Sequence, residues 1–279
     1  MIRTATQLKA KIRNLSGGDN DRARMLIRNF VMERFLERVA LSPYRNNFIL
    51  KGGMLVAAVV GLETRATMDI DTTIKALPLT MENARQVVED VIQINVPDGV
   101  SFTITKTSDI MEGHDYPGIR FMLEASLDKI KQAIKVDIST GDIITPGAVE
   151  YSYKLMFEDR SISIWTYNLE TLLGEKLETI MARETANTRM RDFYDIHILM
   201  KQKTVDYKLL KSAFLATSEK RTTSAHIPRF DEILAAVRSD GTMEALWEKY
   251  RKENFFVGDL TWEEVNQSVK KLKDAAFDE

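Results

Sequence analysis

Residues 48–71 constrain the fold of this chain more than any other stretch. The apolar run Phe48-Ile49-Leu50 reaches Lys51 and the pair Gly52-Gly53, and a short apolar segment and a second strand-like run follow. Glycine adopts backbone conformations that other residues avoid, so two glycines after a strand indicate a tight turn into the next element. The stretch therefore predicts a strand, a helix and a second strand, in that order.

Two aspartates lie in the second strand-like run, which reads Asp69-Ile70-Asp71. Side chains alternate between the faces of a strand, so Asp69, Asp71 and Thr73 share one face. Adjacent carboxylates repel each other unless a cation lies between them, and Mg²⁺ takes oxygen ligands while keeping positions for phosphates. The alternative is a solvated strand face or a helix cap without a ligand.

The glycine pair also has two interpretations. Backbone amides at the start of the helix after Gly53 point outward and favour anionic groups, so they could seat a phosphate. The alternative is a strand-to-helix turn and nothing more. A phosphate cradle beside two carboxylates is the layout of a nucleotidyl-transfer centre, and the order of these elements favours that interpretation.

A third carboxylate lies in the strand-like run at 134–139, where polar and apolar residues alternate. If this strand neighbours the strand of Asp69 and Asp71, Asp137 lies on the same polar face. The alternative is an exposed Asp137 before the turn at 139–142. The residues leave both open.

The remaining pattern predicts a sheet followed by helices. Helices are expected at 2–14, 21–41 and 79–95, and within 21–41 the apolar residues recur at steps of three and four. Three or four strands in meander order are expected at 101–106, 118–126, 133–139 and 161–166, with a loop at 111–118 that could cover a site or connect a hairpin. The pattern becomes helical near Tyr167, so we expect a domain at 1–166 and a helical domain at 167–279 that completes the cleft.

The helical part contains further candidate residues. Lys176 lies beside the apolar stripe of a helix predicted from Asn168 to about 186, and its ammonium could reach a cleft or pair with a neighbouring glutamate. In the next helix, predicted at 188–200, Asp192 and Asp195 share a face with apolar residues. These acids either pair with Arg189 or Arg183, or they hold a nucleotide or Lys176.

Composition excludes several classes of site. The chain has no cysteine and three histidines, which excludes disulfides and cysteine nucleophiles and makes a histidine metal site a poor expectation. The longest apolar run is too short to cross a bilayer, and the N-terminus lacks a signal-peptide core, so we expect a cytoplasmic protein without membrane contact. The net charge of −2 argues against broad electrostatic binding of nucleic acid, although it leaves room for a local basic patch.

These residues resemble the AbiEii/AbiGii-type nucleotidyltransferase toxins of the polymerase-β-like superfamily. The resemblance rests on four runs and extends from about 48 to 199: Leu50-Lys51-Gly52-Gly53, Arg65-x-Thr67-x-Asp69-Ile70-Asp71, Gly174-Glu175-Lys176-Leu177 and Arg191-Asp192-Phe193-Tyr194-Asp195. The Gly-Gly pair replaces the Gly-Ser of the wider superfamily but matches the AbiEii type. The acidic net charge is unusual for an enzyme that acts on RNA.

The resemblance implies a fold and a set of site residues. The expected fold is α/β, in the looser sense α+β, with a mixed sheet, flanking helices and a C-terminal helical domain. Asp69, Asp71 and Asp137 would hold Mg²⁺, with Asp137 the third ligand or the base. The catalytic set adds Lys176 and Asp192. Nucleotide binding would involve Lys51, Gly52, Gly53, Arg65, Lys176 and Asp195, although Arg65 could also simply neutralise buried acids.

The resemblance also implies a function. The expected reaction transfers a nucleoside monophosphate from an NTP, with GTP and CTP as candidates, to an acceptor expected to be tRNA. The setting would be a toxin–antitoxin or phage-defence (abortive infection) system with a cognate antitoxin protein. Two alternatives stay open: a catalytically silent nucleotide-binding regulatory module, and nucleotidyl transfer to a protein side chain.

Overall fold

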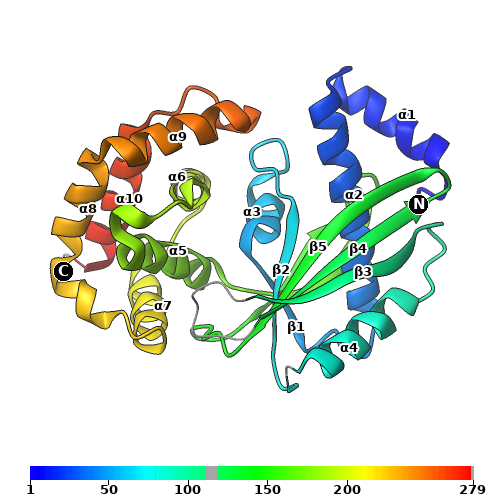
Figure 1. Ribbon diagram of the computed structural model, residues 1–279, viewed down its shortest axis with the longest axis horizontal. Coiled ribbons are helices and arrows are strands. Elements are labelled where there is room, and N and C mark those ends of the chain that lie inside the picture. Colours follow the sequence, from blue (N-terminus) through cyan, green and yellow to red (C-terminus); the bar gives the residue numbers. More distant parts are fainter. Residues whose placement is uncertain (79, 111–117, 278–279) are drawn as a thin grey trace. The chain divides into compact units, whose positions relative to one another are not determined.

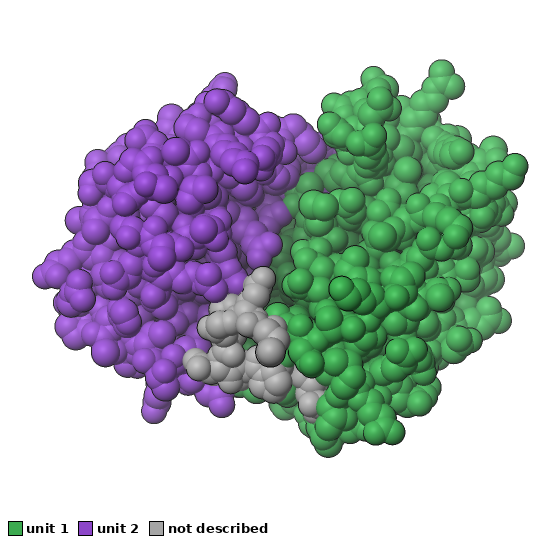
Figure 2. Space-filling view, viewed as in Figure 1, with its two compact units in different colours: residues 1–59, 66–142, 149–166 green, residues 60–65, 143–148, 167–279 purple. Residues whose placement is uncertain are grey.

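The computed structural model describes residues 1–78, 80–110 and 118–277 (Figure 1). The chain divides into two compact units, which are coloured separately in Figure 2. The sheet unit comprises residues 1–59, 66–142 and 149–166, and the helical unit comprises 60–65, 143–148 and 167–279. The chain therefore passes between the units several times, and two short segments that interrupt the sheet unit in sequence belong to the helical unit.

Seven strands form a mixed sheet in the order β3-β4-β5-β2-β1-β7-β6 within the described residues. Strand β2 lies between β5, to which it is parallel, and β1, to which it is antiparallel. Strand β7 continues the sheet on the far side of β1, parallel to it. The strand bounds are β1 Phe48–Lys51, β2 Asp69–Ile74, β3 Ser101–Ile110, β4 Gly118–Leu127, β5 Ile130–Thr140, β6 Val149–Lys154 and β7 Ser161–Thr166.

Helices of the sheet unit cover the apolar face of this sheet. The helix bounds are α1 Ala5–Ser16, α2 Asn20–Leu41, α3 Gly52–Val60 and α4 Met81–Gln93. Helix α2 contacts β5 and β7, and α4 contacts both β3 and α2. Ile134, Val136 and Ile138 of β5 are buried, while the residues between them are partly exposed. The sheet thus has one apolar face under helices and one polar face, as alternation along its strands predicts.

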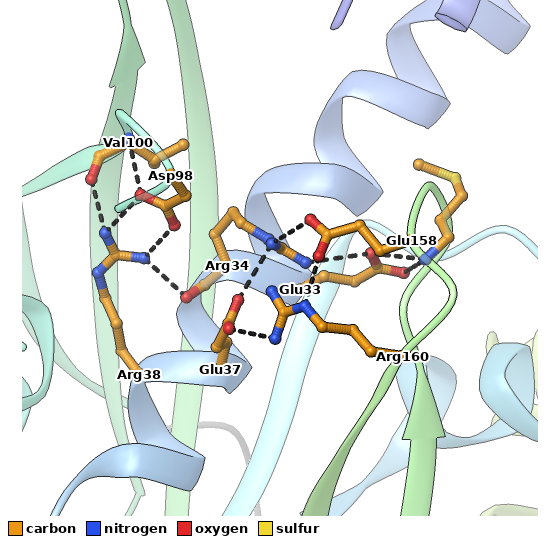
Figure 3. A network of polar contacts seen from close by, with 9 residues as sticks. Glu33, Arg34, Glu37, Arg38, Asp98, Val100, Glu158 and Arg160 are labelled. Carbon is orange, nitrogen blue, oxygen red and sulfur yellow. Dashed lines mark hydrogen bonds and ion pairs between the residues drawn. The ribbon is translucent and has the colours of Figure 1, made fainter. Parts of the chain in front are cut away.

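A buried network of ion pairs joins α2 to the rest of the sheet unit (Figure 3). Arg34 binds Glu37 of its own helix and Glu158 of the β6–β7 connection, each at 3.0 Å. Arg38 donates a bidentate pair of hydrogen bonds to the carboxylate of Asp98, at 2.8 and 3.0 Å. These side chains are almost fully buried, so each charge depends on its partner for the interactions that water would otherwise provide.

The helical unit is built around an aromatic core. Trp247 and Phe193 are buried, and the rings of Phe193 and Trp262 lie 4.9 Å apart. Asn168 caps α5 by accepting a hydrogen bond from the amide of Thr171. The helix bounds are α5 Leu169–Arg183, α6 Met190–Gln202, α7 Tyr207–Lys220, α8 Phe230–Ser239, α9 Gly241–Glu253 and α10 Trp262–Phe277.

The structure confirms the predicted mixed α/β class and most of the predicted elements, with two differences in the sheet. Strand β6 was not predicted, although Val149–Lys154 alternates apolar and polar residues. The strand at 161–166 does not extend a meander, because β7 pairs with β1 and β6 instead of β5. Residues 111–117 of the predicted loop lie outside the described residues. No helix in the described part of the chain is long and apolar enough to span a membrane.

Candidate functional site

The turn after β1 brings a backbone glycine against a carboxylate. Gly52 has a φ of +64°, in the left-handed region that glycine adopts easily. A Cβ atom at this position would lie 2.2 Å from Oδ2 of Asp71 and 2.8 Å from its Cβ. Lys51 and Asp71 are partners in the β1–β2 register. The backbone conformation and the close approach of Asp71 therefore both require glycine at residue 52.

The three predicted carboxylates lie on neighbouring positions of the sheet. Asp69 and Asp71 are two residues apart on β2, so they share a face. The parallel register of β2 and β5 pairs Asp71 with Asp137. The condition left open by the sequence is met, because the two strands are neighbours and Asp137 lies beside Asp71.

Two cations on adjacent positions bind these carboxylates. The ammonium of Lys135 lies 2.7 Å from Oδ2 of Asp69. Arg120 of β4 is the register partner of Asp137 and donates to both of its oxygens, from Nε and Nη2, at 2.8 Å each. Arg120 was not predicted as a site residue. Alternation within 118–126 could have placed it on the polar face, but only the register between strands shows which carboxylate it meets.

The chemistry of this donor set fits a hard divalent cation. All three candidate ligands are carboxylates, the oxygen donors that Mg²⁺ prefers. In this structure both oxygens of Asp137 bind Arg120, and one of Asp69 binds Lys135. Across the described ranges, no group of three or more His, Cys, Asp or Glu residues is arranged so that it could hold a metal. A metal on Asp69 or Asp137 would therefore have to exchange with these cations.

Lys51 binds a different carboxylate from the three discussed above. Its ammonium contacts Asp142, which also accepts a hydrogen bond from the hydroxyl of Ser139 at 2.8 Å. Burial raises the pKa of Asp142, but the charge of Lys51 together with hydrogen bonds from Lys51, Ser139 and Thr73 outweighs burial, so the pKa lies below its usual value. Asp142, expected only in a turn, thus carries a stable negative charge beside the predicted nucleotide-binding lysine.

A second cluster of charges lies in the helical unit. Lys176 of α5 is 8% exposed, and its ammonium lies 2.8 Å from Oδ1 of Asp192 and 2.7 Å from Oδ2 of Asp195. Arg65 donates from Nε to Oδ1 of Asp195 at 2.6 Å. Of the alternatives stated for the two acids, the structure shows both holding Lys176, and Asp195 also pairs with Arg65.

Burial and charge act in opposite directions on this cluster. Burial lowers the pKa of Lys176, but Asp192 and Asp195 outweigh it, and the pKa is raised. Burial raises the pKa of Asp195, but Arg65 and Lys176 outweigh it, and the pKa is lowered. Both groups are therefore held in their charged forms.

Local packing fixes the helix that carries Lys176. Leu173 and Leu177 on the inner side of α5 are fully buried. A Cβ atom at Gly174 would lie 3.1 Å from the backbone nitrogen of Phe214, so a glycine there lets α7 approach closely. Asp192 lies in the first turn of α6, where a negative charge is favoured by the helix dipole.

The predicted site residues thus form two groups, each within one unit. Asp69, Asp71 and Asp137 belong to the sheet unit, with Lys51, Gly52 and Gly53. Lys176, Asp192, Asp195 and Arg65 belong to the helical unit. Among these residues, Arg65 alone is separated from the rest of its sequence run. It belongs to the helical unit, whereas Asp69-Ile70-Asp71, which follow it in the sequence, belong to the sheet unit.

Comparisons with known proteins identify the family and a similar fold. The sequence model of a family described as "Nucleotidyl transferase AbiEii toxin, Type IV TA system" matches residues 34–275. MenT4, a nucleotidyltransferase toxin from Mycobacterium tuberculosis H37Rv, is similar in structure with a TM-score of 0.61, at 14% identity over 96% of this chain and 97% of that chain. JHP933 from Helicobacter pylori has a TM-score of 0.49, at 17% identity over 90% and 91% of the two chains. A search of curated proteins finds no match.

Proposed function

The chain belongs to the AbiEii family of nucleotidyltransferase toxins of type IV toxin–antitoxin systems, and we propose that it transfers a nucleoside monophosphate from an NTP to tRNA in a Mg²⁺-dependent reaction. The observation that carries this proposal is the adjacency of Asp69, Asp71 and Asp137 on one face of the sheet. GTP and CTP are the candidate nucleotides.

The sheet unit would hold the metal and the phosphates. Asp69 and Asp71 would bind Mg²⁺, with Asp137 as a third ligand or as the base that accepts the proton of the acceptor hydroxyl. When bound, the metal would neutralise phosphate charge and help to align the acceptor for in-line attack. The turn at Gly52 lets Asp71 and the backbone approach closely, and the amides after Gly53 would bind phosphate oxygens.

The helical unit would supply positive charge to the triphosphate. Lys176 would contact phosphate oxygens, and Asp192 would keep its ammonium charged and oriented. Two of the three N–H donors of Lys176 are taken by Asp192 and Asp195, and among the residues that the structure describes no acceptor is assigned to the third. That donor suits an anionic ligand.

The acceptor and the biological setting extend the same proposal. We expect the reaction in the cytoplasm, where NTPs and tRNA are both present, and growth arrest when the protein is expressed without its cognate antitoxin. A role in abortive infection would follow from that arrest during phage infection. Inducible expression with and without the candidate antitoxin gene tests it, and normal growth of cells that accumulate the protein alone would contradict it.

The test of the reaction uses purified protein, Mg²⁺, each α-labelled NTP in turn and total tRNA. We expect label on tRNA, loss of that label with EDTA and recovery when Mg²⁺ is added back. Asp69→Asn with Asp71→Asn should abolish labelling, because the variant keeps the size of both side chains and removes both charges. Asp109→Asn, at an exposed position of β3 in the same sheet, is the matched control and should label normally.

The outcomes separate the alternatives. Label on protein instead of tRNA would keep the chemistry and identify a protein side chain as the acceptor. No label on any acceptor, with NTP binding intact in a calorimeter, would contradict the proposed reaction and favour the silent nucleotide-binding module. Undiminished labelling by the Asp69/Asp71 double variant would contradict the proposed metal site.

A further inference from the structure

We infer that Asp195 is a positioning residue that holds Lys176 in place, and that Arg65 fixes Asp195 in turn, so that neither Asp195 nor Arg65 contacts the nucleotide. This inference deepens the proposed function and rests on it, because it takes Lys176 as the residue that contacts the phosphates. It assigns different tasks to three neighbouring charges of the helical unit.

Burial and hydrogen bonding prevent Asp195 from contacting a nucleotide. The residue is 0% exposed, and each of its oxygens has a cationic partner. Oδ1 accepts from Nε of Arg65 at 2.6 Å, and Oδ2 accepts from the ammonium of Lys176 at 2.7 Å. A carboxylate that is enclosed and engaged on both sides orients its partners, and it has no oxygen left to present to a nucleotide.

Arg65 is held in a similar way. It is 5% exposed, and its guanidinium carbon lies 5.9 Å from the centre of the Phe256 ring. The hydroxyl of Tyr194, next to Asp195 on α6, donates to the carbonyl oxygen of Thr64. Two successive residues of the segment 60–65, Thr64 and Arg65, are therefore hydrogen-bonded to two successive residues of α6. The arginine lies within packed protein.

The charges of the cluster balance. Lys176 and Arg65 contribute two positive charges, and Asp192 and Asp195 contribute two negative charges. Buried charges are tolerated when each has a partner of opposite sign, and removing one partner leaves an uncompensated charge. Without Asp195, the second carboxylate contact of Lys176 would be lost and its ammonium would be held only by Asp192. The expected consequence is a displaced lysine.

The experiment is a double-mutant cycle on nucleotide binding. Four proteins are titrated with GTP and with CTP in a calorimeter with excess Mg²⁺: the wild type, Lys176→Met, Asp195→Asn and the variant with both changes. Asp195→Asn should weaken binding by about tenfold in the wild-type background, the usual effect of losing one charge-assisted hydrogen bond. In the Lys176→Met background the same change should alter binding by less than about twofold, because the residue acts through the lysine.

The result that would overturn the inference is an equal factor in both backgrounds, since Asp195 would then contact the nucleotide independently. No effect of Asp195→Asn in the wild-type background would overturn it as well. Unchanged binding by Lys176→Met is a different failure, because it would remove the phosphate role of Lys176 from the proposed function. Asp231→Asn, which changes the exposed aspartate of an ion pair with the buried Lys273 in the same unit, is the matched control and should bind as the wild type does.

A charge-balanced variant protects the test against misfolding. Arg65→Gln combined with Asp195→Asn removes one charge of each sign, so no new uncompensated charge is buried. This variant should fold and should bind nucleotide as weakly as Asp195→Asn does. Binding at the wild-type level by a folded Arg65→Gln/Asp195→Asn protein would overturn the inference.

A pH profile adds a measurement that a purely structural role would not change. The charged and titratable groups around the ammonium are Asp192 and Asp195 of α6 and Arg65, with Tyr250 of α9 close to Arg65. The two carboxylates raise the pKa of Lys176, so Asp195→Asn should lower it. Nucleotide affinity should then decline at a lower pH on the alkaline side than in the wild type, and an unmoved alkaline limb would contradict the positioning role.

Discussion

The turn at Gly52 provides a direct test of the site, because two independent penalties meet at one residue. In Gly52→Ala, the new methyl group must be accommodated at a φ of +64° and against Asp71, whose Oδ2 would lie 2.2 Å away. The first penalty affects stability alone. The second also moves a candidate metal ligand, so it affects both stability and transfer.

The two penalties can be estimated separately. A left-handed conformation costs a residue with a Cβ atom about 1 to 2 kcal/mol. Replacing glycine by alanine also stabilises by about 0.4 to 1 kcal/mol through the unfolded chain, which leaves a net cost of roughly 1 kcal/mol. Steric overlap with Asp71 adds about 1 to 3 kcal/mol, the usual cost of forcing extra atoms into packed structure. Gly52→Ala should therefore lose roughly 2 to 4 kcal/mol in all.

Gly17→Ala is the matched control. Gly17 ends α1 at a φ of +59°, and a Cβ atom there would meet nothing within 4 Å. It should lose only the conformational part of the free energy of unfolding and should keep full transfer activity. Urea unfolding measures the stability of both variants, and labelling of tRNA measures their activity. Equal stability losses together with full activity in Gly52→Ala would refute the reasoning.

Two further predictions concern the network of Figure 3. Burial raises the pKa of Glu33 from 4.5 to about 7, so the folded protein holds this proton more tightly than the unfolded chain. The free energy of unfolding should therefore fall by about 3 kcal/mol as pH rises from 4.5 through 7. Urea titrations at several pH values measure this dependence, and Glu33→Gln should remove most of it. An unchanged pH dependence in Glu33→Gln would contradict the role of Glu33. Arg38→Met should lower the free energy of unfolding by roughly 3 to 5 kcal/mol, because it leaves the buried carboxylate of Asp98 without its cationic partner. Adding Asp98→Asn should recover part of this loss. No recovery would show that the charge of Asp98 is not its cause.

The predictable part of the fold follows from local pattern. The alternation around Asp69 and Asp71 predicts a strand with two carboxylates on one face, and β2 has that form. The glycine pair predicts a turn into a helix, and α3 begins at Gly52. The apolar stripe that predicts α5 is buried as expected. In each case a short stretch contains both the signal and its cause.

The parts that sequence could not predict depend on contacts between distant residues. Whether Asp137 lies beside Asp71 depends on the β2–β5 register, which joins residues 66 positions apart. Strand β7 lies beside β1 for the same kind of reason, since nothing within 161–166 specifies a neighbour. Arg65 was left with two interpretations because its partner, Asp195, is 130 residues away.

The carboxylates of the site could be predicted while most of their cationic partners could not, and the difference has a physical basis. Carboxylates gathered on one strand or one helix face repel each other, so their spacing alone shows that a compensating charge must be near. The compensating charge can come from any element that folding brings close, and here Arg120, Lys135 and Arg65 come from three different segments. An acidic cluster in a sequence therefore predicts that cations surround it, and the three-dimensional structure is needed to identify them. In this protein the identification matters for function, because Arg120 and Lys135 bind carboxylate oxygens that a metal would need. Arg65 binds Asp195, for which no metal is proposed, so this ion pair can be a permanent part of the helical unit.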